Sequence, residues 1–136
     1  MKVLFDANVI VDICEEREPF FANSLEVFFM AARQQIEGII CAGSITDIYY
    51  IVRKFLHNRE KALESIKNIL MTITLVDTKA QDICNAISYN FFDFEDAVVS
   101  AAAQREEADY IVTRNAKDFT ASPVPAITPE DFLMSI

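Results

Sequence analysis

Short apolar runs alternate along the chain with segments in which apolar residues return every three or four positions. The first run, Lys2–Phe5, is apolar and β-branched and is closed by Asp6, which predicts a fully buried strand. A helix is predicted next, because apolar residues recur at the spacing of one helical face, at Phe21, Leu25, Phe28 and Ala32. Gly38 is expected to end this helical pattern. Further strands are expected at 39–42, 73–76, 110–113 and 124–127, and further helices at 45–55, 63–70, 80–87, 94–107 and from residue 129.

Strands that alternate with helices predict a parallel sheet with helices on both faces. No linker, repeat or low-complexity stretch divides the 136 residues, so we expect one domain over residues 1–136. Apolar residues make up 52% of the chain, which argues against disorder. Glycine (2) and proline (4) are scarce, which argues against turn-rich all-β folds.

The charge of the chain narrows the classes of function. A net charge of −9 disfavours a generic basic nucleic-acid-binding module, because neutralising phosphates needs an excess of Lys and Arg. It leaves open a nuclease whose site is built from acids and a metal. Three cysteines without CxxC spacing indicate buried free thiols in a reducing compartment. Without an apolar run of about 18 residues or a signal peptide, we expect a cytoplasmic protein outside the membrane.

Polar residues gather where the predicted strands end and the next helices begin. Asp6 ends the first strand, 44–47 opens the helix after the second, 93–96 opens an Ala-rich helix, and 113–118 follows the fourth strand. Ligands of a parallel α/β sheet bind beyond the carboxyl ends of its strands. Carboxylates within about 4–6 Å raise one another's pKa. A divalent cation such as Mg²⁺ or Mn²⁺ would relieve this repulsion.

Each of these acids also has a purely structural interpretation. Asp6 is a favoured N-cap, and 44–47 and 93–96 both resemble capping boxes. Asp118 could close a turn. Only their joint position at the predicted crevice favours a site. Other acids are expected to be structural: Asp77 as an N-cap, and a solvated cluster of Asp12, Glu15, Glu16 and Glu18.

Four segments, at 3–10, 94–97, 110–115 and 117–119, form a pattern that resembles PIN-domain nucleases, and within them the VapC-like toxins. Residues 3–10 (VLFDANVI) resemble the opening of that family. Residues 94–97 (FEDA) lead through the Ala-rich helix to 110–115 (YIVTRN) and 117–119 (KDF). The resemblance covers the chain in order and length. It implies a PIN-like, Rossmann-like three-layer α/β fold, with a five-stranded parallel sheet of order 3-2-1-4-5 flanked by helices.

The same resemblance implies roles for individual residues. The catalytic acids would be Asp6, Asp47, Asp96 and Asp118, with Asp6 and Asp96 as the metal ligands. Asp47 stands where the family usually has Glu, and Asn115 where many members have Asp, so Asp118 is expected either to supply the missing carboxylate or to act through water. Supporting roles fall to Asn115 and to Thr113, which would orient a ligand. Substrate phosphate contacts fall to Arg114 and Lys117.

The activity implied is Mg²⁺- or Mn²⁺-dependent hydrolysis of RNA phosphodiester bonds by an endoribonuclease. An antitoxin protein and a homodimer are the implied partners. Two alternatives stay open. Asp47 and Asn115 are compatible with a PIN-like binding module that has lost catalysis. Asp6 and Thr113 are compatible with a receiver-like signalling domain whose Asp accepts phosphate, although no lysine follows the fifth strand at the expected place.

Overall fold

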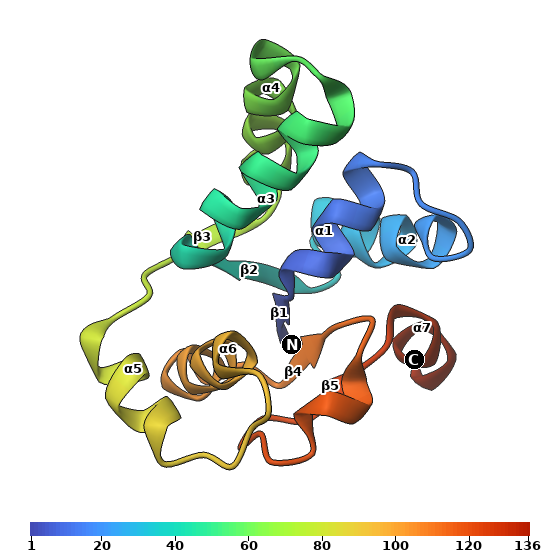
Figure 1. Ribbon diagram of the computed structural model, residues 1–136. Helices are drawn as coiled ribbons and strands as arrows, with labels where there is room; N and C mark the ends of the chain where they lie inside the picture. The colour runs from blue at the N-terminus through green and yellow to red at the C-terminus, as the bar shows by residue number, and fades with distance from the viewer.

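The chain folds around a five-stranded parallel sheet (Figure 1). The structure is a computed structural model that describes all of residues 1–136. Its order is β3-β2-β1-β4-β5, and each neighbouring pair is parallel. The strands are β1 (Lys2–Phe5), β2 (Glu37–Cys41), β3 (Thr74–Val76), β4 (Tyr110–Val112) and β5 (Ala126–Ile127). This architecture confirms the predicted fold.

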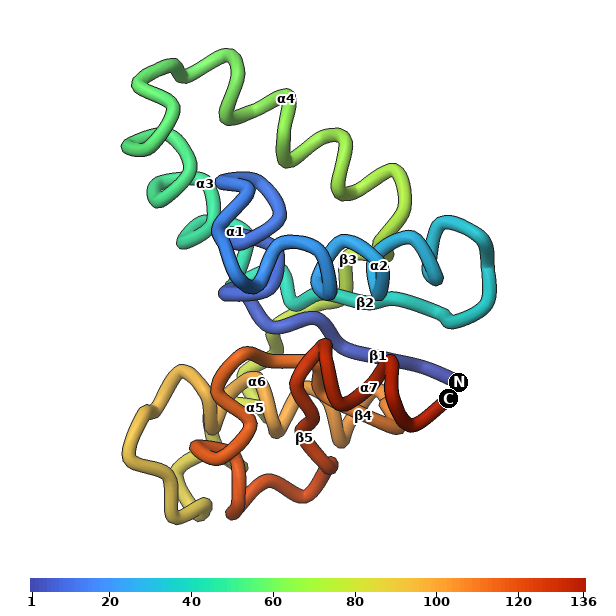
Figure 2. Tube along the Cα trace, turned by 90° about the vertical axis from the view of Figure 1, so that its right-hand side faces the viewer, coloured from blue at the N-terminus to red at the C-terminus, as the bar shows by residue number.

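Helices cover both faces of the sheet, which gives three layers (Figure 2). The larger apolar cluster joins one face to α1 (Ala7–Cys14), α2 (Phe21–Ala32), α3 (Ala42–Leu56), α4 (Arg59–Leu70) and α7 (Pro129–Ser135). The smaller cluster joins the opposite face to α6 (Phe94–Arg105) and to the 3-10 helix η1 (Ala116–Phe119). Helix α5 (Ala80–Ile87) packs against α6. Because successive strand residues face opposite sides, Val3 and Phe5 enter the larger cluster and Leu4 the smaller one.

Several boundaries differ from the sequence prediction: α3 begins at Ala42 rather than at residue 45, and α4 begins at Arg59 rather than at residue 63. Gly38 lies inside β2, where a Cβ atom would come within 2.6 Å of Ile73 Cδ1, so the missing side chain lets the layers meet. Helix α6 ends at Arg105, because Glu107 adopts a left-handed backbone (φ 57°) that a helix cannot continue through. Strand β5 retains only two residues of the predicted four.

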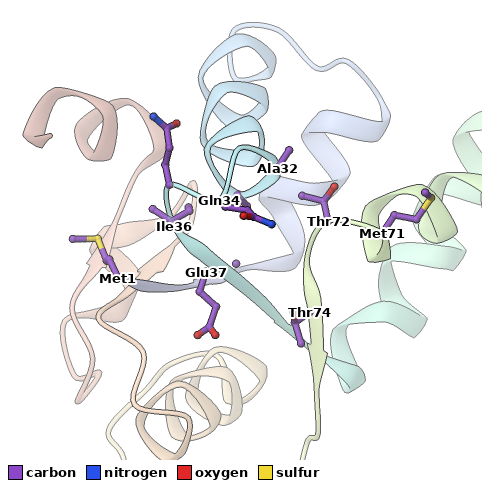
Figure 3. A pocket seen from close by; sticks show the side chains of 11 residues that line it. Met1, Ala32, Gln34, Ile36, Glu37, Met71, Thr72 and Thr74 are labelled. Carbon is purple, nitrogen blue, oxygen red and sulfur yellow. The ribbon is translucent and has the colours of Figure 1, made fainter.

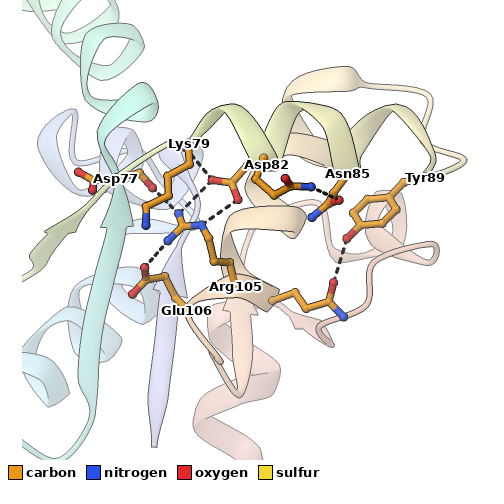
Figure 4. Close-up of polar contacts among 9 residues, drawn as sticks. Asp77, Lys79, Asp82, Asn85, Tyr89, Arg105 and Glu106 are labelled. Atoms are coloured by element: carbon orange, nitrogen blue, oxygen red, sulfur yellow. Dashed lines mark hydrogen bonds and ion pairs between the residues drawn. The ribbon is translucent and has the colours of Figure 1, made fainter.

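The prediction that Asp77 is an N-cap is wrong. Asp77 takes part instead in an ion-pair network at the α5–α6 contact (Figure 4). Helix α5 begins after Lys79 instead, whose amide donates to Asp82 Oδ2 at 2.9 Å. Arg105 of α6 donates from Nε and Nη2 to the two Asp82 oxygens, both at 2.9 Å. The contribution of Asp77 is its carbonyl oxygen, which accepts from Arg105 Nη2 at 2.6 Å.

All three cysteines are free thiols, as predicted, but their burial differs. Cys41 is buried, Cys14 is half-buried and Cys84 is exposed on α5, whose outer face no layer covers. The helices are too short or too polar to cross a lipid bilayer.

Candidate active site

A cavity of about 480 Å³ lies at the carboxyl edge of the sheet, where β1 ends and α6 begins. Five acids from three separate segments line it: Asp6, Asp47, Asp93, Glu95 and Asp96. The remaining lining residues are Ala7, Asn8, Val11, Arg17, Tyr50, Ile51 and Arg114. The fold therefore brings Asp6, Asp47 and Asp96 to one place, as the joint position of polar residues at the strand ends predicted.

Asp6 is fixed in this cavity by two hydrogen bonds. Its Oδ1 accepts from the Ala7 amide at 2.8 Å, which caps α1, and its Oδ2 accepts from Thr113 Oγ1 at 2.8 Å. Thr113 is fully buried, and its hydroxyl oxygen also accepts from Asn8 Nδ2 at 3.3 Å and from the Asn115 amide at 3.2 Å. Asp6 is thus both an N-cap and a cavity residue, so its two interpretations are compatible.

The first turn of α6 supplies three of the other acids. Asp93 is the N-cap, and its carboxylate accepts from the Asp96 amide at 3.1 Å, as the capping-box pattern predicted. This start places Glu95 and Asp96 in the first turn, beside the cavity. Asp47 comes from α3, where Tyr50 and Ile51 follow at the spacing of one helical face and line the same cavity.

The acids raise one another's pKa, which is the electrostatic conflict expected of a cation site. Burial, together with the charges of Asp6, Asp93, Glu95 and Asp118, raises the pKa of Asp96 to about 7. Burial also raises the pKa of Asp6, against the hydrogen bonds from Thr113 and Ala7. The pKa of Glu95 is raised by burial and then by the neighbouring Asp47 carboxylate.

The residues after β4 are divided between the cavity and the surface around it. Asn115, Lys117 and Asp118 are exposed and do not line the cavity, although the charge of Asp118 reaches Asp96. Arg114 does line it. The roles assigned to these four residues stay predictions.

The prediction that Asp12 belongs to a solvated acidic cluster is wrong. Its side chain is fully buried in α1, and its Oδ2 lies 3.2 Å from Arg114 Nε. The hydropathy pattern did contain a signal, because Asp12 stands between Val11 and Ile13 in a helix of eight residues that is otherwise nearly all apolar.

Sequence reasoning also gave no site role to four other residues of this cavity: Asn8, Arg17, Asp93 and Glu95. Asn8 could have been found, because it follows Asp6 by two positions in the segment that carries the family resemblance. Its Oδ1 accepts from the Arg114 amide at 3.1 Å, which ties α1 to the loop after β4. No local signal singles out Arg17, because only the fold of the α1–α2 connection brings it back to the cavity.

The donor set of the cavity fits Mg²⁺ or Mn²⁺. Carboxylate oxygens are the ligands that these hard cations prefer, and Mg²⁺ commonly uses one or two of them together with several waters. No three His, Cys, Asp or Glu side chains are arranged to enclose an ion by themselves. The arrangement therefore suits a site in which two carboxylates hold an ion and water completes its coordination.

A second cavity, of about 520 Å³, lies at the opposite end of the strands (Figure 3). It opens between Met1, the start of β2 at Glu37 and the start of β3 at Thr74. Glu37 is the one ionisable side chain among its lining residues. This cavity lacks the paired acids that metal-dependent or acid–base chemistry needs, so the carboxyl edge carries the candidate site.

Comparisons with known proteins identify the family to which this fold belongs. A family described as "PIN domain" matches residues 2–117. Ribonuclease VapC1 of Aquifex aeolicus (strain VF5) is 28% identical over 136 residues, spanning 96% of this chain and 92% of that protein.

Solved structures show the same fold. VapBC2 from Rickettsia felis, bound to a DNA fragment from its promoter, matches with a TM-score of 0.73 at 18% identity, covering 94% of this chain and 98% of that chain. VapC20 of Mycobacterium tuberculosis, a sarcin-ricin loop cleaving toxin, matches with a TM-score of 0.71 at 11% identity, covering 90% and 95%. With a family match over residues 2–117, the chain belongs to the PIN-domain family.

Proposed function

We propose that this chain is a divalent-metal-dependent endoribonuclease that hydrolyses RNA phosphodiester bonds, and that it is the toxin of a toxin–antitoxin pair. The observation that carries the proposal is the group of five acids around one cavity at the carboxyl edge of a PIN-domain sheet. The relatives support the choice of RNA, because one is a ribonuclease and another cleaves the sarcin-ricin loop.

In this proposal Asp6 and Asp96 hold a Mg²⁺ or Mn²⁺ ion. The ion, when bound, activates water and stabilises negative charge on a phosphate. Asp6 is held in one orientation by Ala7 and Thr113, so it needs no rearrangement to act as a ligand. Asp47 lies beside Glu95, whose raised pKa suits a group that exchanges protons near neutral pH. Asp118 contributes negative charge from outside the cavity, and Arg114 and Lys117 bind phosphate.

An antitoxin protein is the proposed partner, in the cytoplasm, and the toxin is proposed to be a homodimer. The Rickettsia felis relative was solved as a VapBC complex, and the Klebsiella pneumoniae structure that this chain also matches is a toxin–antitoxin complex. The chain offers exposed apolar side chains at the cavity, with Tyr50 59% and Ile51 46% exposed on α3. Among the phenylalanines of α2, Phe29 is the exposed one, at 40%.

An RNA cleavage assay tests the activity. Purified protein is incubated with total RNA in Mg²⁺, in Mn²⁺ and in EDTA, and Asp6→Asn and Asp96→Asn are compared with wild type. We expect cleavage only with metal, and a loss of about 100-fold or more in each variant, because each removes a charge that holds the ion. Asp131→Asn is the matched control, since this exposed acid of α7 lies outside the cavity and should leave the rate unchanged.

Two results would count against the proposal. Equal cleavage by wild type and both variants would show that the activity belongs to a contaminant or to another site. Absence of cleavage in every metal, with the protein folded, would favour the PIN-like binding module without catalysis. The receiver-like alternative finds no support in the comparisons, in which the matching family is described as "PIN domain".

A further inference from the structure

A buried carboxylate next to the cavity has no hydrogen-bond partner in the chain. Asp12 of α1 is fully buried, and neither of its side-chain oxygens accepts a hydrogen bond. Oδ2 lies 3.2 Å from Arg114 Nε, and Oδ1 lies 3.8 Å from Arg17 Nε. A buried charge of this kind is very costly unless it is paired, so the two arginines are what makes an ionised Asp12 tolerable.

These two arginines are also the only basic side chains that line the acidic cavity. They reach it from different segments. Arg17 follows α1, and its amide donates to the Asp12 carbonyl at 2.9 Å in a turn where Glu16 takes a left-handed conformation (φ 50°). Arg114 follows β4, and its guanidinium carbon lies 4.7 Å from the centre of the Phe20 ring.

The pairing sets the direction of the guanidinium groups. Without Asp12, an arginine that lines a cavity with five acids would turn onto those acids and compete with a cation for them. Asp12 contacts Arg114 through Nε, which fixes the orientation of the guanidinium group and leaves its two Nη groups for another partner. Stacking on Phe20 restricts the same side chain further.

We propose that Asp12 is a positioning residue that holds Arg17 and Arg114 at the rim of the acidic cavity, where the two guanidinium groups bind a phosphate of the RNA. This inference rests on the proposed ribonuclease function and adds a phosphate clamp to it. A chain with a net charge of −9 has few ways to attract a polyanion, and two arginines beside the reacting phosphate provide one. Arginine also matches the geometry of phosphate oxygens, to which it donates in pairs.

The test removes the charge of Asp12 and retains its shape. Asp12→Asn is compared with wild type by the kcat and KM of RNA cleavage. It is also compared by fluorescence anisotropy with a random-sequence pool of labelled single-stranded RNA in EDTA. We expect KM and Kd to rise about 10-fold, because charge-assisted contacts to phosphate are misplaced, while kcat changes less than about twofold. Asp131→Asn is the control, since this exposed acid of α7 lies outside the cavity and pairs with neither arginine.

Two further measurements separate positioning from a general structural effect. Arg17→Gln and Arg114→Gln should each lower the slope of log Kd against log salt by about 0.7, the value for one lost phosphate contact on a single strand. In the Arg114→Gln background, Asp12→Asn should add less than its 10-fold effect, because the shorter of the two contacts of Asp12 is already lost.

Unchanged KM and Kd in a folded Asp12→Asn protein would overturn the inference, and so would an equal loss in Asp131→Asn. If Asp12→Asn does not fold, Arg114→Gln decides, and an unchanged KM in that variant also overturns it. The outcomes separate the two proposals. Cleavage by wild type with no effect of these variants rejects only the clamp, whereas arginine-dependent RNA binding without cleavage rejects only the nuclease.

Discussion

The carboxyl group of Asp96 shows what the cavity does to one residue. Its ordinary pKa is 3.8, and burial together with the charges of Asp6, Asp93 and Glu95 raises this pKa to about 7. In the metal-free protein at neutral pH, the group is therefore divided between its neutral and ionised forms. A cation can bind well only to the ionised form, so metal binding and proton loss are coupled.

Metal affinity should consequently depend on pH. We expect the affinity for Mg²⁺ or Mn²⁺ to rise by up to about tenfold per pH unit below pH 7 and to level off above it, with release of one proton per ion bound. Isothermal titration calorimetry in two buffers of different ionisation enthalpy measures both quantities. Asp96→Asn should weaken binding and remove most of this dependence, whereas Asp131→Asn should keep it. An affinity that is flat between pH 6 and 8 in wild type would contradict this account.

Between helices, the pair of Asp82 and Arg105 fixes α5 against α6 (Figure 4). Burial opposes the charge of Asp82, but the hydrogen bonds from Arg105 and the Lys79 amide outweigh it and lower the pKa of this carboxyl. Because α6 carries Glu95 and Asp96 at its other end, the same pair helps to set where these acids lie. Helix α6 is thus fixed by an ion pair at its carboxyl end, and the acids at its amino end line the cavity.

Removal of Asp82 should therefore cost stability. We expect Asp82→Ala to lower the free energy of unfolding by about 3 kcal/mol, near the low end for a broken buried pair, because the Arg105 side chain is 20% exposed. Urea unfolding followed by circular dichroism measures the change. Asp77→Asn is the control, since Asp77 contributes only its carbonyl oxygen to the network.

The sign of the pH effect gives this prediction a second readout. The folded-state pKa of Asp82 lies below its ordinary 3.8, so its contribution is present above that pH and is lost as the pH falls through the lower value. The difference in stability between wild type and Asp82→Ala should accordingly shrink in acid. A difference that stays constant down to the acid transition would argue against the ionised pair.

The whole molecule has a net charge of −9, and five of its acids lie together at the carboxyl edge of the sheet. Between pH 3.8 and about 7, folded Asp96 retains a proton that the unfolded chain has lost. The stability of the metal-free protein should therefore fall as the pH rises through this window. A bound cation removes the repulsion, so it stabilises the folded state through its binding energy.

Thermal unfolding measures both the repulsion among these acids and the stabilisation by a bound cation. Above pH 7, we expect Mg²⁺ or Mn²⁺ at about 100 times its Kd to stabilise the protein by about 2.7 kcal/mol, seen as a rise of several degrees in Tm. In EDTA, Asp96→Asn should have a higher Tm than wild type, because one repelling charge is gone, and metal should raise it much less. A lower Tm for this variant in EDTA would mean that the acids of the cavity do not repel one another.

Much of the fold could be predicted from the sequence, because the hydropathy patterns that specify strands and helices are local. Buried parallel strands appear as apolar runs, as at Lys2–Phe5, and helices as a repeat of three or four residues, as along α2. The resemblance to PIN domains supplied the strand order, which no local pattern encodes. Gly38 was misplaced because its role depends on Ile73, a residue remote in the chain that lies just before β3.

The sequence by itself determined which residues form strands and helices, and that acids stand where those elements meet. These properties depend on hydropathy and capping, which act over a few neighbouring residues. Only the tertiary structure decided that Asp12 is buried, that Arg17 returns to the cavity, and that Asn115 and Asp118 lie outside it. Burial and charge pairing depend on distances through space between segments that are remote in the chain, and packing alone sets those distances.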